Sequence, residues 1–120
     1  MQTSKRWIDL VTRLKSKVYV DDTDFIVNGV KQMQAQGKKV VIVACSRNHR
    51  STLYTKLRLA GVKPQTAVII TIDDVVSGRL KTYRSRPLII PRWTWTRIVS
   101  EAMNNPTGKI DTRDGNFTRI

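Results

Sequence analysis

Cations and indoles alternate in one short segment of this sequence, residues 92–97, which reads Arg-Trp-Thr-Trp-Thr-Arg. The bases of a nucleic acid stack on exposed aromatic side chains, and arginine guanidinium groups hold its phosphates. Trp95 lies at helical spacing from the apolar residues that follow it and is expected in the core, whereas Trp93 lies off that stripe. The segment therefore predicts nucleic-acid contacts from Arg92, Trp93 and Arg97.

A second candidate site, Ser46 to Arg50, lies between an apolar run and a predicted helix. Free backbone N–H groups and the helix dipole favour an anion at such an N-terminus, and arginines add charge and forked donors. The segment predicts a phosphate-binding site formed by Ser46, Arg47, Asn48 and Arg50. The alternative is that Ser46 or Asn48 only caps the helix and that both arginines are solvated.

The chain has one histidine and one cysteine, which limits the catalytic and metal chemistry open to it. His49 could act as a general base. No nucleophile or carboxylate is adjacent to it in sequence, so we interpret it as a surface or capping residue. Cys45 ends an apolar run and is interpreted as a small buried hydrophobic residue. A single thiol forms no internal disulfide, and one residue of each kind excludes a zinc site of ordinary Cys/His composition.

Carboxylates gather in a few places, at Asp21, Asp22, Asp24, Asp73 and Asp74. Paired acids of this kind could bind metal ions for a small nuclease. Capping of the predicted helices explains the same residues without a metal, and we prefer this interpretation. The sequence therefore predicts no metal, no cofactor and no catalytic residue. A metal-dependent nuclease that uses Asp73 and Asp74 stays open as an alternative.

Positive charge dominates the composition and is unevenly distributed. The chain has 22 Lys and Arg against 9 Asp and Glu, a net charge of +13, and residues 47–62 and 79–97 contain no acid. Such segregation builds a positive face that attracts phosphate chains. The alternatives are a solvated surface that aids solubility and a basic face that docks an acidic protein partner.

Membrane and secretory classes are disfavoured by the apolar pattern. No apolar run approaches the length of about 20 residues that spans a bilayer. No segment combines a basic face with a broad apolar one. Charges among the first residues interrupt any signal-peptide core. We therefore expect a cytoplasmic protein with no membrane partner.

Helices and strands are expected to alternate along the chain. Short apolar runs rich in β-branched residues predict buried strands at 40–44, 67–72 and 87–90, with a short extended piece at 18–20. Amphipathic or capped segments predict helices at 5–17, about 22–36, about 46–60, a short one from Asp73 or Asp74, and one at 95–104 after a loop at 91–94. Right-handed crossovers then give an α/β three-layer sandwich with a small, mainly parallel sheet.

The domain organisation is expected to be simple. The length fits one domain, which we place at residues 1–106, and the chain has no internal repeats or low-complexity tracts. A polar tail follows at 107–120. It is predicted either to turn a small hairpin at Asp114 and Gly115 or to be disordered.

The run 37–47, an apolar strand that ends in Cys-Ser-Arg and precedes a helix, resembles the strand and loop of RecA-like helicase domains. The resemblance covers residues 25–103, and within it residues 88–91 take the place of the Asp-Glu metal motif of that family. It implies a RecA-like or Rossmann-like topology. It also implies that Ser46 and Arg47 contact the phosphate backbone of a bound strand.

Two departures from that family bear on chemistry. No G-x-x-x-x-G-K-[ST] phosphate loop occurs anywhere in the chain. The third predicted strand is followed by Arg92 and Trp93 rather than by acids, so no carboxylate stands there to hold Mg²⁺. The resemblance therefore implies a degenerate RecA-like unit without ATPase parts.

The two basic segments are expected to meet in space. Working residues of parallel α/β folds lie beyond the carboxyl ends of the strands. Four residues would converge there: Arg47, Arg50, Arg92 and Trp93. Arg84 and Arg86 would lie at the opposite edge. The first hypothesis is a non-catalytic protein that binds DNA or RNA. The others are the small nuclease and an interaction or inhibitor module whose basic face docks an acidic protein.

Overall fold

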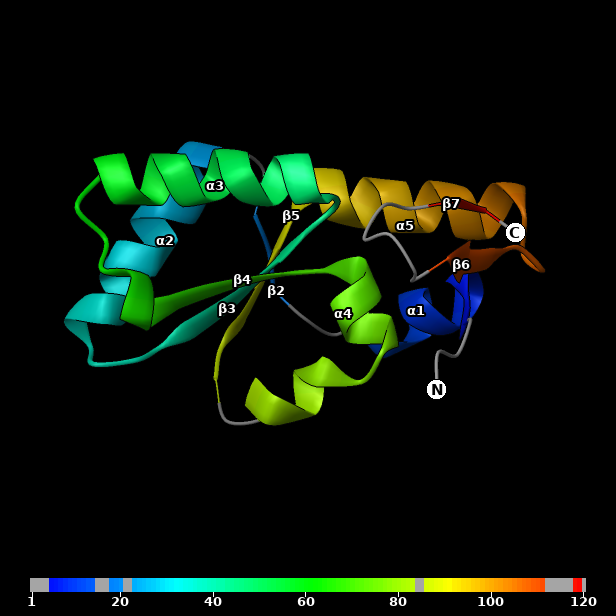
Figure 1. The fold of residues 1–120 in the computed structure, drawn as a ribbon, viewed down its shortest axis with the longest axis horizontal. Coiled ribbons are helices and arrows are strands. Elements are labelled where there is room, and N and C mark those ends of the chain that lie inside the picture. The colour runs from blue at the N-terminus through cyan, green and yellow to red at the C-terminus, as the bar shows by residue number, and fades with distance from the viewer. Residues whose placement is uncertain (1–4, 15–17, 21–22, 84–85, 112–117, 120) are drawn as a thin grey trace.

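The fold is that of a computed structural model, which describes residues 5–14, 18–20, 23–83, 86–111 and 118–119. Within these residues the central element is an all-parallel sheet of four strands in the order β2-β5-β3-β4 (Figure 1). The strands are β2 (Val18–Val20), β3 (Val40–Ala44), β4 (Ala67–Thr71) and β5 (Leu88–Pro91). The three predicted strands are confirmed, and the extended piece at 18–20 is the fourth.

Helices cover both faces of this sheet. They are α1 (Trp7–Leu14), α2 (Thr23–Ala35), α3 (Arg47–Leu59), α4 (Ile72–Val76) and α5 (Arg92–Asn104), with 3-10 turns η1 (Pro64–Thr66) and η2 (Arg79–Tyr83). Strands and helices alternate along the central sheet. The result is the α/β, Rossmann-like sandwich that the sequence predicted.

Strand β3 shows why the apolar runs are continuous. Val40, Ile42 and Ala44 are buried in one core cluster, whereas Val41 and Val43 are buried in the other. Alternate side chains of a strand point to opposite faces of the sheet. Because helices cover both faces, every position of this strand has to be apolar.

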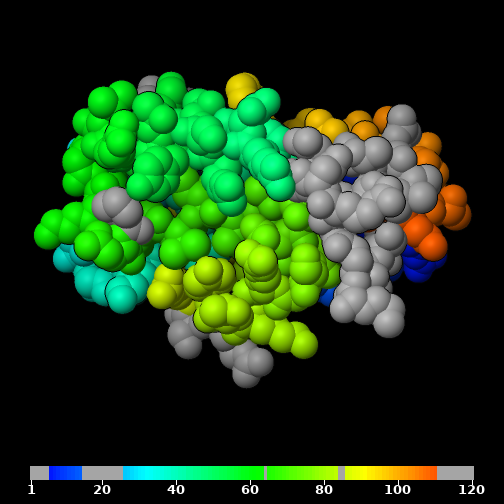
Figure 2. Space-filling model, viewed as in Figure 1, coloured from blue at the N-terminus to red at the C-terminus, as the bar shows by residue number. Residues whose placement is uncertain are grey.

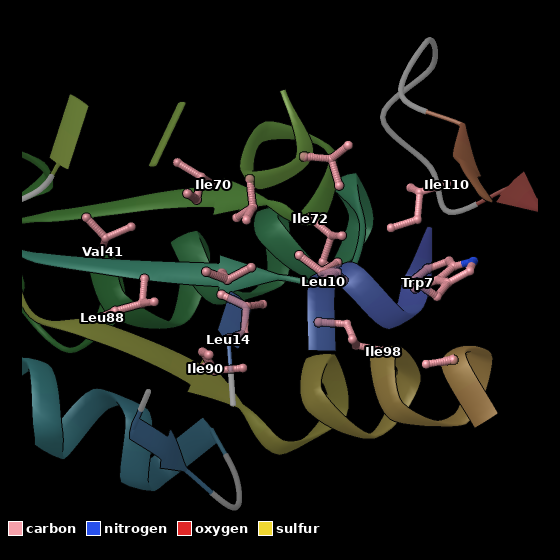
Figure 3. Packing of buried hydrophobic residues seen from close by; sticks show 14 residues of the cluster. Trp7, Leu10, Leu14, Val41, Ile70, Ile72, Leu88, Ile90, Ile98 and Ile110 are labelled. Carbon is pink, nitrogen blue, oxygen red and sulfur yellow. The ribbon is translucent and has the colours of Figure 1, made fainter. Parts of the chain in front are cut away.

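The two core clusters divide the helices between the faces of the sheet. One cluster joins the sheet to α2 and α3 through residues such as Ile26 and Leu53. The other joins it to α1, α4 and α5, and includes Trp7, Leu10 and Ile98 (Figure 3). Helix α3, which follows β3, and helix α5, which follows β5, therefore pack against opposite faces.

A second, antiparallel sheet brings the two ends of the chain together. Its order is β1-β6-β7, and its strands are β1 (Lys5–Arg6), β6 (Lys109–Asp111) and β7 (Thr118–Arg119). Ile110 of β6 is fully buried in the cluster that holds α1 and α5, and the backbone N–H of Trp7 donates to the carbonyl of Gly108. Strands β6 and β7 pair as a hairpin, while the predicted turn at Asp114 and Gly115 lies outside the described residues.

Three predicted helix starts were wrong. Helix α1 begins at Trp7 and not at residue 5, because β1 pairs with β6. Helix α4 is capped by Thr71, not by Asp73 or Asp74. Helix α5 begins at Arg92 directly after β5, where a loop at 91–94 was predicted. Pro91 is its N-cap, and the missing N–H of a proline is tolerated at a helix start because the first N–H groups have no partner within the helix.

Candidate nucleic-acid interface

Helix α3 begins with a capped first turn. The Ser46 hydroxyl accepts a hydrogen bond from the backbone N–H of His49 at 3.1 Å, which confirms Ser46 as the N-cap. Arg47 is the first helical residue, and its side chain is exposed, as are those of Asn48 and Arg50. The cap therefore fixes the helix start and leaves three polar side chains facing solvent.

Helix α5 is tied to the end of β3 by a residue that sequence reasoning missed. Thr94 is fully buried, and its hydroxyl donates to the carbonyl oxygen of Val43 at 2.8 Å. Within the basic segment it resembled a spacer between two indoles. The signal that could have found it is its spacing, because Thr94 precedes Ile98 and Ala102 at four-residue intervals. The bond exists because β5 lies beside β3, which places the first turn of α5 over the end of β3.

A ring contact joins the two candidate segments. The ring centroids of His49 and Trp93 lie 5.4 Å apart, with the planes tilted by 45°. Figure 1 shows α3 and α5 beginning beside each other at the carboxyl ends of the strands and running apart. Trp93 is 70% exposed, so most of its surface is open to a ligand, whereas Trp95 is half-buried against the core. The expected difference in burial between the two indoles is therefore confirmed.

His49 was interpreted as a surface or capping residue, and the surface part of that interpretation was wrong because His49 is buried. Its Nδ1 accepts a hydrogen bond from the backbone N–H of Cys45 at 3.0 Å. Burial lowers the pKa of His49, which keeps the imidazole neutral so that Nδ1 can accept. The signal that could have found this lay in the helix stripe, because His49 precedes Leu53 and Leu57 at four-residue intervals.

Cys45 is half-buried beside the same helix start. Burial raises the pKa of its thiol, and the positive charge of Arg97 opposes part of that rise. A raised pKa keeps the sulfur protonated and weakens it as a nucleophile. The Arg97 side chain is exposed.

The two helices α3 and α5, which begin at the carboxyl edge of the sheet, lack the acidic residues that usually stabilise a helix start. Neither α3 nor α5 has an acidic residue in its first turn, and both begin with an arginine, Arg47 and Arg92. Cations are unfavourable at the positive end of a helix dipole. The helix dipole therefore does not favour an arginine at either position.

The third helix at this edge has the acids that α3 and α5 lack. Thr71 and Asp74 form a reciprocal capping box, in which the Asp74 carboxylate accepts from the backbone N–H of Thr71 at 3.0 Å. The Thr71 hydroxyl also donates to Asp73, and Arg79 pairs with Asp74 at 3.4 Å. Capping therefore accounts for Asp74, as the sequence suggested. Over the described residues, no three His, Cys, Asp or Glu side chains gather as a metal site.

The arginines of α3 face solvent without acidic partners. In the part of the chain that the structure describes, Arg6 pairs with Asp9 and Arg79 with Asp74, and no carboxylate pairs with Arg47 or Arg50. Positive potential is therefore left uncompensated at the start of α3.

The opposite edge of the sheet holds Arg86, as expected from its place before β5. Its guanidinium lies over the ring of Tyr83, 5.1 Å from the centroid, and is half-buried. Arg84, which was predicted to accompany it, lies outside the described residues. The Arg86 guanidinium therefore packs against another side chain of the protein.

Strand order gives the carboxyl edge a topological switch point. Strands β3 and β5 are neighbours, and the helices that follow them pack against opposite faces of the sheet. Ligands of open α/β sheets bind at such a switch point, outside the carboxyl ends of the strands. His49 and Trp93 meet at this point, between the two arginine-bearing helix starts.

No protein-family model, curated protein or solved structure matches this chain. None of the described helices has the length and apolar character needed to cross a membrane.

Proposed function

We propose that this chain is a non-catalytic nucleic-acid-binding protein whose site lies between the starts of α3 and α5. The observation that carries the proposal is the pair of arginine-bearing helix N-termini, free of first-turn acids, that flank an exposed indole. Phosphates would interact with Arg47, Arg50 and Arg92, and with backbone N–H groups of the two helices.

The exposed indole supports nucleic acid over a small anion. A phosphate or sulfate ion needs only cations and N–H groups, whereas Trp93 offers a flat apolar surface beside them. Stacking of a base on such a surface is tolerant of sequence, because every base has a π-face. The Trp93 ring contacts His49, which is held by the Cys45 N–H, so the platform is pre-oriented.

The nuclease alternative has less support. Asp73 and Asp74 are engaged by Thr71, and Asp74 also by Arg79. An acidic protein partner would use the same arginines but would have less use for a stacking surface. Both alternatives are separated from the proposal by one experiment.

The experiment is a binding assay with labelled single- and double-stranded DNA and RNA, each with and without Mg²⁺. We expect complexes without cleavage, and on duplex log affinity should fall against log salt with a slope of about −0.9 per phosphate contact. Mg²⁺-dependent cleavage that disappears in Asp73→Ala would establish the nuclease instead. Binding to a polyaspartate peptide with no binding to nucleic acid would favour the protein-docking module.

A further inference from the structure

A groove runs along the free edge of the parallel sheet, beside helix α3. Strand β4 is the last strand of the sheet and pairs with β3 alone among the described strands. The groove is open, has a volume of about 590 Å³, and lies between one side of α3 and the residues of β4. Figure 1 shows α3 lying along β4, and Figure 2 shows the surface of the molecule from the same side. This volume is within the range of about 300–1,000 Å³ typical of ligand sites.

The α3 side of the groove alternates cation, aromatic and cation. Arg50, Tyr54 and Arg58 all line it, and their four-residue spacing places them on one face of the helix. All three side chains are exposed, and Tyr54 is 45% exposed although it is a large aromatic residue. The β4 side is apolar, with Val68 and Ile69 half-buried. The pattern is the one that single-stranded nucleic acid requires, a basic track with an aromatic stacking surface.

The groove is continuous with the interface proposed above. Arg50 belongs to both, because it lies in the first turns of α3 and also lines the groove. From Arg47 to Arg58 the helix rises about 16 Å. At the spacing of about 3.4 Å between stacked bases of one strand, this length corresponds to about five nucleotides.

We propose that the ligand is single-stranded nucleic acid, and that it continues from Trp93 along α3 into the groove, where a base stacks on Tyr54. This inference rests on the proposed function and specifies its substrate class. A duplex cannot use Tyr54 in this way, because its bases are already stacked and only their edges are open. Residues 47–62 contain no acid, so no carboxylate on this helix repels the phosphates.

A peptide strand that pairs with the free edge of β4 is the competing occupant. Such a peptide takes its affinity from backbone hydrogen bonds to the edge strand. It would need neither the aromatic ring of Tyr54 nor a phosphate-binding guanidinium at Arg58. The alternation of cation and aromatic side chains therefore favours nucleic acid, and the two occupants differ in their dependence on Tyr54.

The test measures the affinity of oligothymidylates of increasing length for the full chain and for Tyr54→Ala, Tyr54→Phe, Arg58→Ala and Lys56→Ala. Lys56 is the matched control, because it is an exposed cation on the same helix that does not line the groove. Tyr54→Ala should lower the affinity for single strands about tenfold or more, and Tyr54→Phe should retain it. Arg58→Ala should reduce the salt slope by about 0.7. Lys56→Ala should leave affinity and slope close to those of the unaltered chain.

The dependence of affinity on oligonucleotide length separates the proposal of the groove from the proposed function. Affinity of the unaltered chain should continue to rise with oligonucleotide length after that of Tyr54→Ala has stopped rising. Equal affinities for all four variants, together with weak binding by Arg47→Ala/Arg92→Ala, would overturn the groove and leave the proposed function intact. Tighter binding of duplex than of single strands would also overturn it. Failure of every nucleic acid to bind, with capture of an acidic peptide instead, would overturn both.

Discussion

Both edges of the parallel sheet are basic. The cations of the amino edge follow the C-terminal ends of helices, whereas those of the carboxyl edge stand at helix N-termini. At the amino edge, the exposed Lys38, Lys39 and Lys63 come just after the glycine turns that end α2 and α3. Cations beside helix C-termini are favourable, because they compensate the negative end of the dipole. At the carboxyl edge, Arg47 and Arg92 occupy helix N-termini, where the same charge is unfavourable.

The comparison shows that net charge alone does not identify a binding surface. The lysines of the amino edge have a structural explanation in the helix ends that they follow. Arg47 of the carboxyl edge has no carboxylate partner among the described residues, and with Arg92 it begins a helix beside an exposed indole at the switch point of the sheet. A site is therefore expected where charge is placed against the preference of the local structure, since a ligand is then needed to compensate it.

The largest expected effect is on nucleic-acid affinity, when positive charge is removed from the carboxyl edge and not from the amino edge. Arg47→Ala/Arg92→Ala should weaken nucleic-acid binding by about 3 kcal/mol, because each charge-assisted hydrogen bond contributes about 1.5–3 kcal/mol. The matched control, Lys38→Ala/Lys39→Ala, removes the same charge from the amino edge and should change affinity only slightly. Titrations at several salt concentrations should show the slope reduced by about one per lost contact in the first variant only. Equal losses from both pairs would mean that diffuse charge explains the binding.

Removal of the stacking surface should have the next largest effect. Trp93→Ala should cost about 1–3 kcal/mol in binding to single strands. Because Trp93 is 70% exposed, the free energy of unfolding should change little. The aromatic residue of the amino edge, Tyr83, already has Arg86 over its ring, so it offers no comparable surface. Fluorescence titration of Trp93→Ala beside Trp93→Phe checks the point, and an unchanged affinity in Trp93→Ala would remove stacking from the interface.

Sequence patterns predicted the strands and the exposed residues, but not which strands are neighbours in the sheet. Strand β3 was recognisable because burial on both faces requires a continuous apolar run, and Trp93 was recognisable because it lies off the apolar stripe of its helix. Burial patterns do not say which strands are adjacent. The order β5-β3 and the particular pairing of His49 with Trp93 therefore had no signal in the sequence, although parallel strands did predict that the two segments meet at the carboxyl edge.

A third prediction concerns the bond that holds the carboxyl edge together. Thr94→Val removes the buried hydroxyl that donates to Val43 and leaves that carbonyl without its partner. We expect the free energy of unfolding to fall by about 1–2 kcal/mol, whereas Thr94→Ser should retain most of the bond. Urea unfolding of the two variants provides the measurement. A Thr94→Val variant as stable as the unaltered chain would show that the start of α5 is positioned by packing alone.

The smallest expected effect is a pH dependence of the free energy of unfolding that is caused by His49, at the carboxyl edge. The chain has one histidine, and its pKa in the folded state is lowered by burial. As pH falls below about 6.5, the unfolded chain binds the proton first, so the free energy of unfolding decreases. The stabilisation is complete above this pH and is lost as pH falls through the pKa of folded His49.

Comparison with His49→Gln isolates this contribution. Glutamine has a carbonyl that can accept from the Cys45 N–H in place of Nδ1, but it does not titrate. Urea unfolding between about pH 7.5 and pH 5.5, above the ordinary range of carboxylate titration, should show stability falling with pH in the unaltered chain and a flat profile in His49→Gln. The same slope in both proteins would mean that another group is responsible. In that case the neutral, buried imidazole would no longer distinguish the carboxyl edge from the amino edge.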